Sequence, residues 1–188
     1  MTGNIIIIHG ASSAGKSTLA RAVQREIEVP FLHISYDLFI DGDIVPWERF
    51  RDGTFSWADV RPSVLQGFRQ WWAVMAEAGN NLIIDHIVES EAEMAFLVDL
   101  LSEIDVFFVG LHCSLEELER RERARGNRRG GDARSDLAFV HRDKIYDLEL
   151  DSENASVEEN ARVLIEGWRG RKRPSGFDQM AQKGLLIK

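Results

Sequence analysis

The sequence has few of the features that mark disulfide-rich, metal-binding or membrane-spanning proteins. Its 188 residues include one cysteine, Cys113, which excludes an internal disulfide and a metal site built from several cysteines. No apolar stretch approaches the roughly 20 residues needed to cross a bilayer. The first residues, Met-Thr-Gly-Asn, lack the basic segment of a secretory signal. We therefore expect a soluble, cytoplasmic protein with no membrane partner.

Basic residues are also scarce relative to acidic ones. The chain has 23 Lys and Arg against 31 Asp and Glu, for a formal charge of −8. Because nucleic-acid-binding proteins hold the phosphate backbone mainly with basic side chains, this balance predicts no nucleic-acid partner. The length fits one domain with a single buried core. We assign residues 1–170 to that domain and 171–188 to a poorly ordered C-terminal tail.

Short apolar runs alternate with stretches of helical spacing along the chain. Strands are expected at residues 5–8, 31–34, 82–85, 106–111 and 147–150. Helices are expected at residues 17–27, 60–78, 91–101, from 114 onward, and 157–168, whereas 35–59 is expected to be irregular. This alternation predicts an α/β fold, a three-layer sandwich with a mostly parallel five-stranded sheet and helices on both faces.

A phosphate-binding motif follows the first expected strand. Gly10, Gly15, Lys16 and Ser17 match the Walker A pattern G-x-x-x-x-G-K-[ST]. In this pattern backbone N–H groups converge on phosphate oxygens, the lysine reaches the outer phosphates and the hydroxyl reaches Mg²⁺. An accidental match is the alternative, but the motif lies between a strand and a helix as its chemistry requires. The predicted nucleotide-binding residues are Gly10, Ser12, Ser13, Ala14, Gly15, Lys16, Ser17 and Thr18.

Two acidic residues stand where expected strands end. Asp85 closes an apolar run and is a candidate for the Mg²⁺ shell together with Ser17; a residue that caps the next element is the alternative. Asp37 follows the second expected strand and is a candidate base for an acceptor hydroxyl. Its competitors are the other carboxylates of the irregular segment, Asp41, Asp43 and Asp59.

An arginine-rich stretch spans residues 116–134, with seven arginines. Glutamates four residues before several of them predict a salt-bridged helix. Arg125, Arg128, Arg129 and Arg134 flank or occupy a glycine-bearing loop, and we expect a lid over the triphosphate at about residues 125–134. A merely solvated loop is the alternative.

Together these pieces resemble the chloramphenicol phosphotransferase-like family of P-loop small-molecule kinases. The matching stretches begin at Ile5-Ile-Ile-Ile-His-Gly-Ala-Ser-Ser-Ala-Gly-Lys-Ser17 and include Ser35-Tyr-Asp-Leu-Phe39, Leu82-Ile-Ile-Asp85, Arg121-Glu-Arg-Ala-Arg-Gly-Asn-Arg128 and Val140-His141. The resemblance implies transfer of the γ-phosphoryl group of ATP to a hydroxyl of a chloramphenicol-type antibiotic or related metabolite, and thus a role in antibiotic resistance. It implies that Asp37 is the general base, that Lys16 and Ser17 serve phosphate and Mg²⁺, and that Arg125 and Arg128 belong to the lid.

Two features leave the acceptor open. His86 stands where the family's resistance enzyme has a second acidic residue, and residues 40–60 do not clearly match that enzyme. A nucleotide kinase and a regulatory nucleotide switch are the alternative functions. A GTPase switch would require an Asn-Lys-x-Asp motif, which does not occur. The sequence does not indicate the oligomeric state.

Overall fold

The chain folds around one parallel sheet. The computed structural model describes residues 2–125 and 131–184, without the side chains of Asp43 and Arg125. Its strands are β1 (Asn4–His9), β2 (Phe31–Ser35), β3 (Asn81–His86), β4 (Asp105–His112) and β5 (Leu148–Asp151). They pair in the order β2-β3-β1-β4-β5, and every pair is parallel. The predicted α/β class and five-stranded sheet are confirmed.

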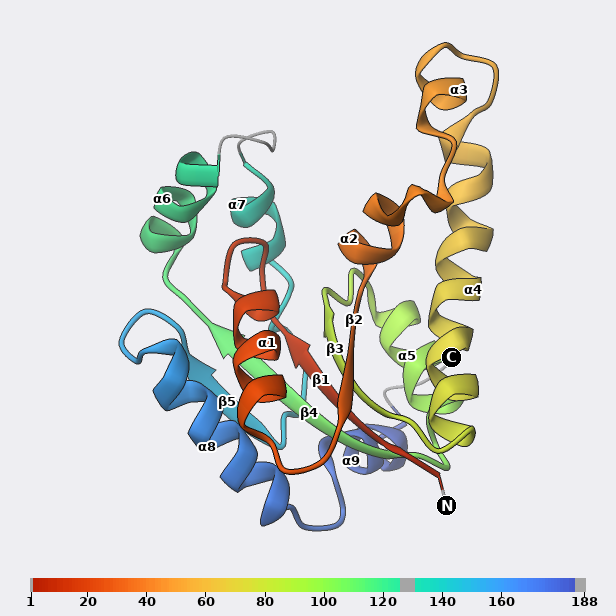
Figure 1. Cartoon of the computed structure of the whole chain (residues 1–188). Helices are drawn as coiled ribbons and strands as arrows, with labels where there is room; N and C mark the ends of the chain where they lie inside the picture. The colour runs from red at the N-terminus through yellow and green to blue at the C-terminus, as the bar shows by residue number, and fades with distance from the viewer. Residues whose placement is uncertain (1, 126–130, 185–188) are drawn as a thin grey trace.

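Helices cover both faces of the sheet (Figure 1). One face packs against α1 (Lys16–Glu26), α6 (Leu115–Arg125), α7 (Asp132–Leu137) and α8 (Val157–Arg169). The other face packs against α4 (Trp57–Glu77), α5 (Glu91–Leu100) and α9 (Gly176–Gln182). The isoleucine run of β1 supplies both layers, because Ile6 and Ile8 point to one core while Ile5 and Ile7 point to the other, all with no exposed surface. The three-layer arrangement follows directly from this alternation.

The segment expected to be irregular, residues 35–59, contains short helices. It forms α2 (Tyr36–Phe39), the π-helical turn η1 (Ile40–Ile44) and α3 (Trp47–Arg51), and α4 begins three residues earlier than predicted. The arm that carries α3 projects from the body of the molecule at the far end of α4 (Figure 1). Aromatic packing holds this arm, with the rings of Trp47 and Trp57 4.9 Å apart and those of Phe50 and Trp57 5.4 Å apart. Such contacts leave no periodic pattern in the sequence, so the prediction was wrong here.

The C-terminal segment also departs from the prediction of a poorly ordered tail. Its helix α9 buries Phe177 and Met180 against the sheet face that α4 and α5 cover. The Arg171 guanidinium donates to Asp105 at 2.8 and 2.9 Å and to Asn4 at 3.1 Å. Residues 171–184 therefore belong to the packed body, because two apolar side chains three positions apart give α9 a face to bury.

None of the described helices combines the length and the apolar character required to span a bilayer. The expected cytoplasmic location stays a prediction.

Candidate active site

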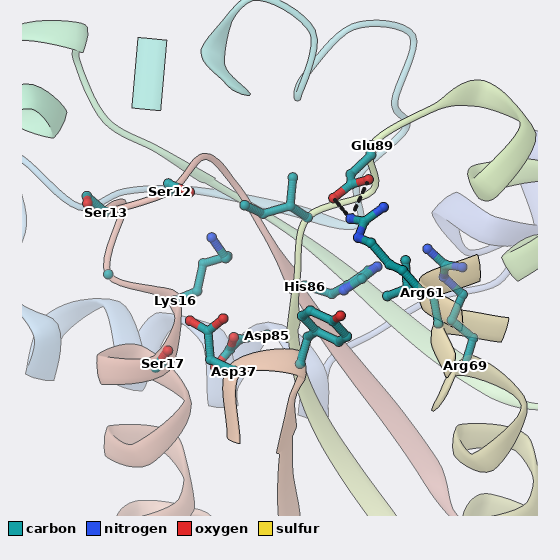
Figure 2. A pocket seen from close by; sticks show the side chains of 14 residues that line it. Ser12, Ser13, Lys16, Ser17, Asp37, Arg61, Arg69, Asp85, His86 and Glu89 are labelled. Atoms are coloured by element: carbon teal, nitrogen blue, oxygen red, sulfur yellow. Dashed lines mark hydrogen bonds and ion pairs between the residues drawn. The ribbon is translucent and has the colours of Figure 1, made fainter. Parts of the chain in front are cut away.

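The predicted site residues meet at the carboxyl edge of the sheet. Here β1 runs into residues 10–17, called the phosphate loop below, β2 leads into α2, and β3 ends beside them. A cavity of about 180 Å³ opens at this edge, called the main cavity (Figure 2). The predicted residues among its lining are Ser12, Ser13, Gly15, Lys16, Ser17, Asp37 and Asp85. Ligands of open parallel sheets bind at such an edge.

The phosphate loop has the backbone that its glycines allow. Gly15 has a φ of 97°, which glycine adopts without a side-chain clash, and α1 begins at the next residue. Gly10 is required for a different reason: a Cβ atom there would lie 2.5 Å from the Leu111 carbonyl oxygen of β4. The Lys16 ammonium donates to the carbonyl oxygens of Gly10 and Ala11 at 2.9 and 2.8 Å. Its charge therefore lies over the loop.

Two residues that the sequence reasoning missed hold the loop from the arginine-rich side. The backbone N–H of Ser12 donates to the carboxylate of Asp136 in α7 at 2.9 Å. Arg121 donates to the Ala14 carbonyl at 3.3 Å and to the Ser152 carbonyl at 2.7 Å. Arg121 does form the predicted ion pair with Glu117, at 2.6 Å, but it also contacts the loop. Helical spacing predicts only the ion pair between Arg121 and Glu117, because the other contacts join segments that are distant in sequence.

Asp85 is oriented by a histidine of the neighbouring strand. Its carboxylate lies 2.6 Å from His33 Nε2, and both side chains are largely buried. The capping alternative for Asp85 is excluded, since α5 is capped by Ser90, whose hydroxyl accepts the N–H of Glu93. The Asp85 carboxylate therefore faces the main cavity with one oxygen held by His33.

Asp37 lies in the first turn of α2, whose start is fixed by the Ser35 hydroxyl accepting the Leu38 N–H at 3.1 Å. Figure 2 shows the Asp37 carboxylate in the main cavity, which Lys16 and Asp85 also line. The competitors Asp41 and Asp59 are exposed and do not line this cavity. Geometry thus favours Asp37 over these two, because its carboxylate shares the main cavity with the phosphate loop.

A second cavity, of about 250 Å³, lies on the other side of the phosphate loop. Ser13, Ala14, Gly15 and Thr18 line it, together with Leu111 of β4 and side chains from the segment that follows β5. Since Ser13 and Gly15 line both cavities, the loop separates a mixed polar and apolar space from the main cavity that holds Asp37.

The predicted lid arginines are only partly within the described structure. Arg125 is the last residue of α6, but its side chain lies outside the described part, and Arg128 lies outside the described residues altogether. Arg134 pairs with Glu119 at 2.7 Å and stays largely exposed. The lid therefore stays a prediction.

The main cavity also contains side chains that no motif indicated. Arg61 and Arg69 of α4 and Glu89 before α5 line its side away from Ser12 and Ser13 (Figure 2). Tyr36 of α2 lines the cavity as well. Arg61 and Arg69 are eight positions apart, so they share one helix face. That spacing was visible in the sequence, but without the strand positions it did not indicate which side faces the loop.

Comparison with known proteins agrees with the motifs. The chain matches the chloramphenicol phosphotransferase-like protein family over residues 3–169. It belongs to that family. The chain is 30% identical over 202 residues to the Mycobacterium tuberculosis protein named "Putative O-phosphotransferase Rv2636". This match covers 97% of this chain and 90% of that one. It is also 30% identical over 144 residues to the adenylyl-sulfate kinase of Vibrio vulnificus, covering 77% and 67% of the two chains.

Among solved structures, the fold is similar to that of the M. tuberculosis APS kinase CysC in complex with AMPPNP and APS. The TM-score is 0.65 at 22% identity, with 89% of this chain and 98% of that chain covered. This similarity concerns the fold, and it agrees with the P-loop kinase architecture that the sequence predicted. Membership of this family supports phosphotransfer of the kinase type as the activity of this protein.

Proposed function

We propose that this protein is an ATP-dependent O-phosphotransferase that moves the γ-phosphoryl group to a hydroxyl of a small molecule. The observation that supports it best is the placement of Asp37 and the phosphate loop in one cavity. A loop for the triphosphate on one side and a carboxylate for the acceptor on the other are the two parts that such a transfer needs. A regulatory switch would need the loop but would give Asp37 no task.

The nucleotide is expected to bridge the two cavities. Its phosphates would lie on the N–H groups of the phosphate loop, where the start of α1 directs its positive dipole end. The nucleoside would occupy the second cavity, beside Leu111 and Thr18. Lys16 would exchange the carbonyl oxygens of Gly10 and Ala11 for phosphate oxygens.

The residues for Mg²⁺ fit that ion. Ser17 and Asp85 present a hydroxyl and a carboxylate oxygen to the main cavity, and Mg²⁺ prefers few protein oxygens together with phosphate oxygens and water. His33 holds one carboxylate oxygen of Asp85 and so orients the other. When bound, the ion would neutralise charge on the phosphates.

Asp37 would act on the acceptor. Its carboxylate would receive the proton of the acceptor hydroxyl as that oxygen bonds to the γ-phosphorus. The bond between the γ-phosphorus and the β–γ bridging oxygen would break, and ADP would leave with that oxygen. The Ser35 cap fixes the helix that carries Asp37 and so helps to orient the carboxylate. Arg125 and Arg128 would add positive charge to the transferring group from the lid. The family's description suggests a chloramphenicol-type antibiotic as the acceptor, and a related hydroxylated metabolite is the alternative.

The test is ATP consumption by the purified chain with Mg²⁺ against a panel of hydroxylated antibiotics and metabolites, with product masses. Asp37→Asn should lower turnover about 10²–10⁴-fold, the usual contribution of a general base, while Mg²⁺·ATP still binds. Asp41→Asn is the matched control, because Asp41 is exposed and outside the cavity. Full turnover by Asp37→Asn would refute the role of Asp37. Binding of ATP with no acceptor-dependent turnover would favour a switch.

A further inference from the structure

Two arginines of α4 face the part of the main cavity where an acceptor would lie. Arg61, Leu65 and Arg69 recur every four residues, so they form one face of the helix, and all three line the cavity. Figure 2 shows both guanidinium groups on the side opposite Ser12 and Ser13. We call Arg61 and Arg69 the arginine face. It is separate from the phosphate loop and its lysine.

Arg69 is largely buried, and the carboxylate that pairs with it also accepts from other donors. Its side chain is 14% exposed, and among the described residues Glu93 is the carboxylate that pairs with it. Glu93 is shared, because it also accepts from His86 Nε2 at 2.8 Å and from the Glu89 N–H at 2.7 Å. A guanidinium has five N–H donors, and the buried Nε of Arg69 has no hydrogen-bond partner within the described structure. One donor of this guanidinium is therefore buried and unused.

Arg61 has a partner that a ligand can displace. Its guanidinium lies 3.2 and 3.4 Å from the carboxylate oxygens of Glu89. The two side chains are 40% and 55% exposed, and exposed ion pairs contribute little stability. An anion that enters the cavity can therefore take the place of Glu89 at low cost.

The other carboxylates of the cavity do not oppose this. Asp85 is held by His33 and lies with Asp37 on the side of Lys16, where the Lys16 ammonium and the proposed Mg²⁺ would balance their charge. The planar arginine fork matches the two oxygens of a carboxylate or the oxygens of a phosphate. A neutral acceptor would leave Arg69 desolvated without a second anionic partner, which is unfavourable.

We propose that the arginine face binds an anionic group of the acceptor, so that the substrate is a hydroxylated anion, a carboxylate or a phosphate ester, rather than a neutral alcohol. This inference rests on the proposed function, because the hydroxyl of that same molecule must reach Asp37. In this proposal Arg61 and Arg69 select the substrate, and Glu89 pairs with Arg61 when no substrate is bound.

The test uses the whole chain loaded with Mg²⁺ and AMPPNP, whose binding is measured first by calorimetry. Acceptors are then titrated in matched pairs: gluconate against sorbitol, glycerate against glycerol, and glycerol 3-phosphate against glycerol. We expect at least one charged member to bind about tenfold or more tightly than its neutral partner, and the pairs distinguish carboxylate from phosphate ester. No preference in any pair would overturn the inference, whereas failure to bind Mg²⁺·AMPPNP would count against the proposed function instead.

Variants locate the preference within the cavity. Arg61→Gln should reduce the preference for the charged member severalfold, and Glu89→Gln should increase it. Arg69→Lys keeps a positive charge for Glu93 but removes the fork, so it should weaken anion binding without loss of melting temperature. Arg142→Gln is the control, because Arg142 is exposed and donates to the Ala138 carbonyl of its own segment. An unchanged preference in both Arg61→Gln and Arg69→Lys would overturn the assignment.

Discussion

His9 lies directly before the phosphate loop and is fully buried. Its Nε2 donates to the Val140 carbonyl at 2.8 Å, and its Nδ1 lies 3.1 Å from the His86 carbonyl oxygen and 3.3 Å from the Val88 nitrogen. The two carbonyls would favour a protonated ring, so burial rather than hydrogen bonding keeps the ring neutral. Burial is the main cause that lowers the pKa of His9 from 6.5 to about 3, with Lys16 and His141 adding positive charge nearby.

This placement predicts a loss of stability in mild acid. Because the folded-state pKa lies below that of the unfolded chain, the unfolded chain binds protons first as the pH falls. The stability that neutral His9 provides is thus present above pH 6.5 and is lost progressively toward pH 3. At pH 4.5 we expect on the order of 2 kcal/mol less stability from this group. Urea unfolding of the wild type and of His9→Asn between pH 7.5 and 4.5 measures it.

The difference between the two pH profiles isolates His9, because carboxylates and His141 titrate in both proteins. The variant should be less stable at neutral pH and should lose less on acidification. Parallel profiles would mean that His9 does not control this pH dependence.

At the scale of single residues, the sequence predicted the residues that belong to a motif or directly follow a strand. Lys16, Ser17, Asp37 and Asp85 are brought together as expected, because parallel strands end at one edge. Asp136 and the arginine face were not predicted. Their contacts depend on how helices lie over the sheet, which no local spacing encodes.

At the scale of elements, β1 and β4 determine where the phosphate loop begins. The strands pair from Asn4 with Asp105 to His9 with Gly110, and Gly10 then passes close to the Leu111 carbonyl. The apolar runs predicted these strands to within two residues at each end. The short helices of residues 36–51 escaped prediction, because aromatic contacts rather than helical periodicity hold them.

Gly10→Ala should therefore separate the ends of β1 and β4. Its Cβ would lie 2.5 Å from a backbone oxygen that has no rotamer by which to retreat. We expect a loss of about 1–3 kcal/mol, the usual cost of overpacking, together with weaker nucleotide binding. Urea unfolding and nucleotide titration measure the two effects.

Gly67→Ala is the matched control, because an added Cβ there meets nothing within 4 Å and the position lies inside α4. It should stabilise the chain by up to about 1 kcal/mol through helix propensity. If both variants behaved alike, close packing at Gly10 would not be the cause.

For the whole molecule, the C-terminal segment completes one of the two cores. Phe177 packs edge-on against Phe108 of β4 with ring centroids 5.3 Å apart, and Met180 is buried beside it. Arg171 and Arg173 pair with Asp105 at the start of the same strand. Two arginines at the start of the predicted tail are thus used in ion pairs with the sheet.

Removal of residues 171–188 should destabilise the chain strongly. Burial of each large apolar side chain contributes about 1.5–3 kcal/mol, so loss of Phe177 and Met180 should cost about 3–6 kcal/mol. Thermal and urea unfolding measure the loss. The double substitution Phe177→Ala and Met180→Ala should reproduce most of it in a chain of full length. If the truncated chain were as stable as the wild type, these residues would not contribute to the packed core.

The contact between Asn4 and Arg171 joins residues 167 positions apart, and this separation affects the order of events on the ribosome. A nascent chain that has reached residue 170 already holds all five strands, yet Phe108 still lacks its cover. Contacts of such long range slow folding and prolong the exposure of apolar surface. During synthesis we therefore expect the part of this sheet face that α9 covers, beside α4 and α5, to stay open to chaperones and to other unfinished chains until α9 emerges.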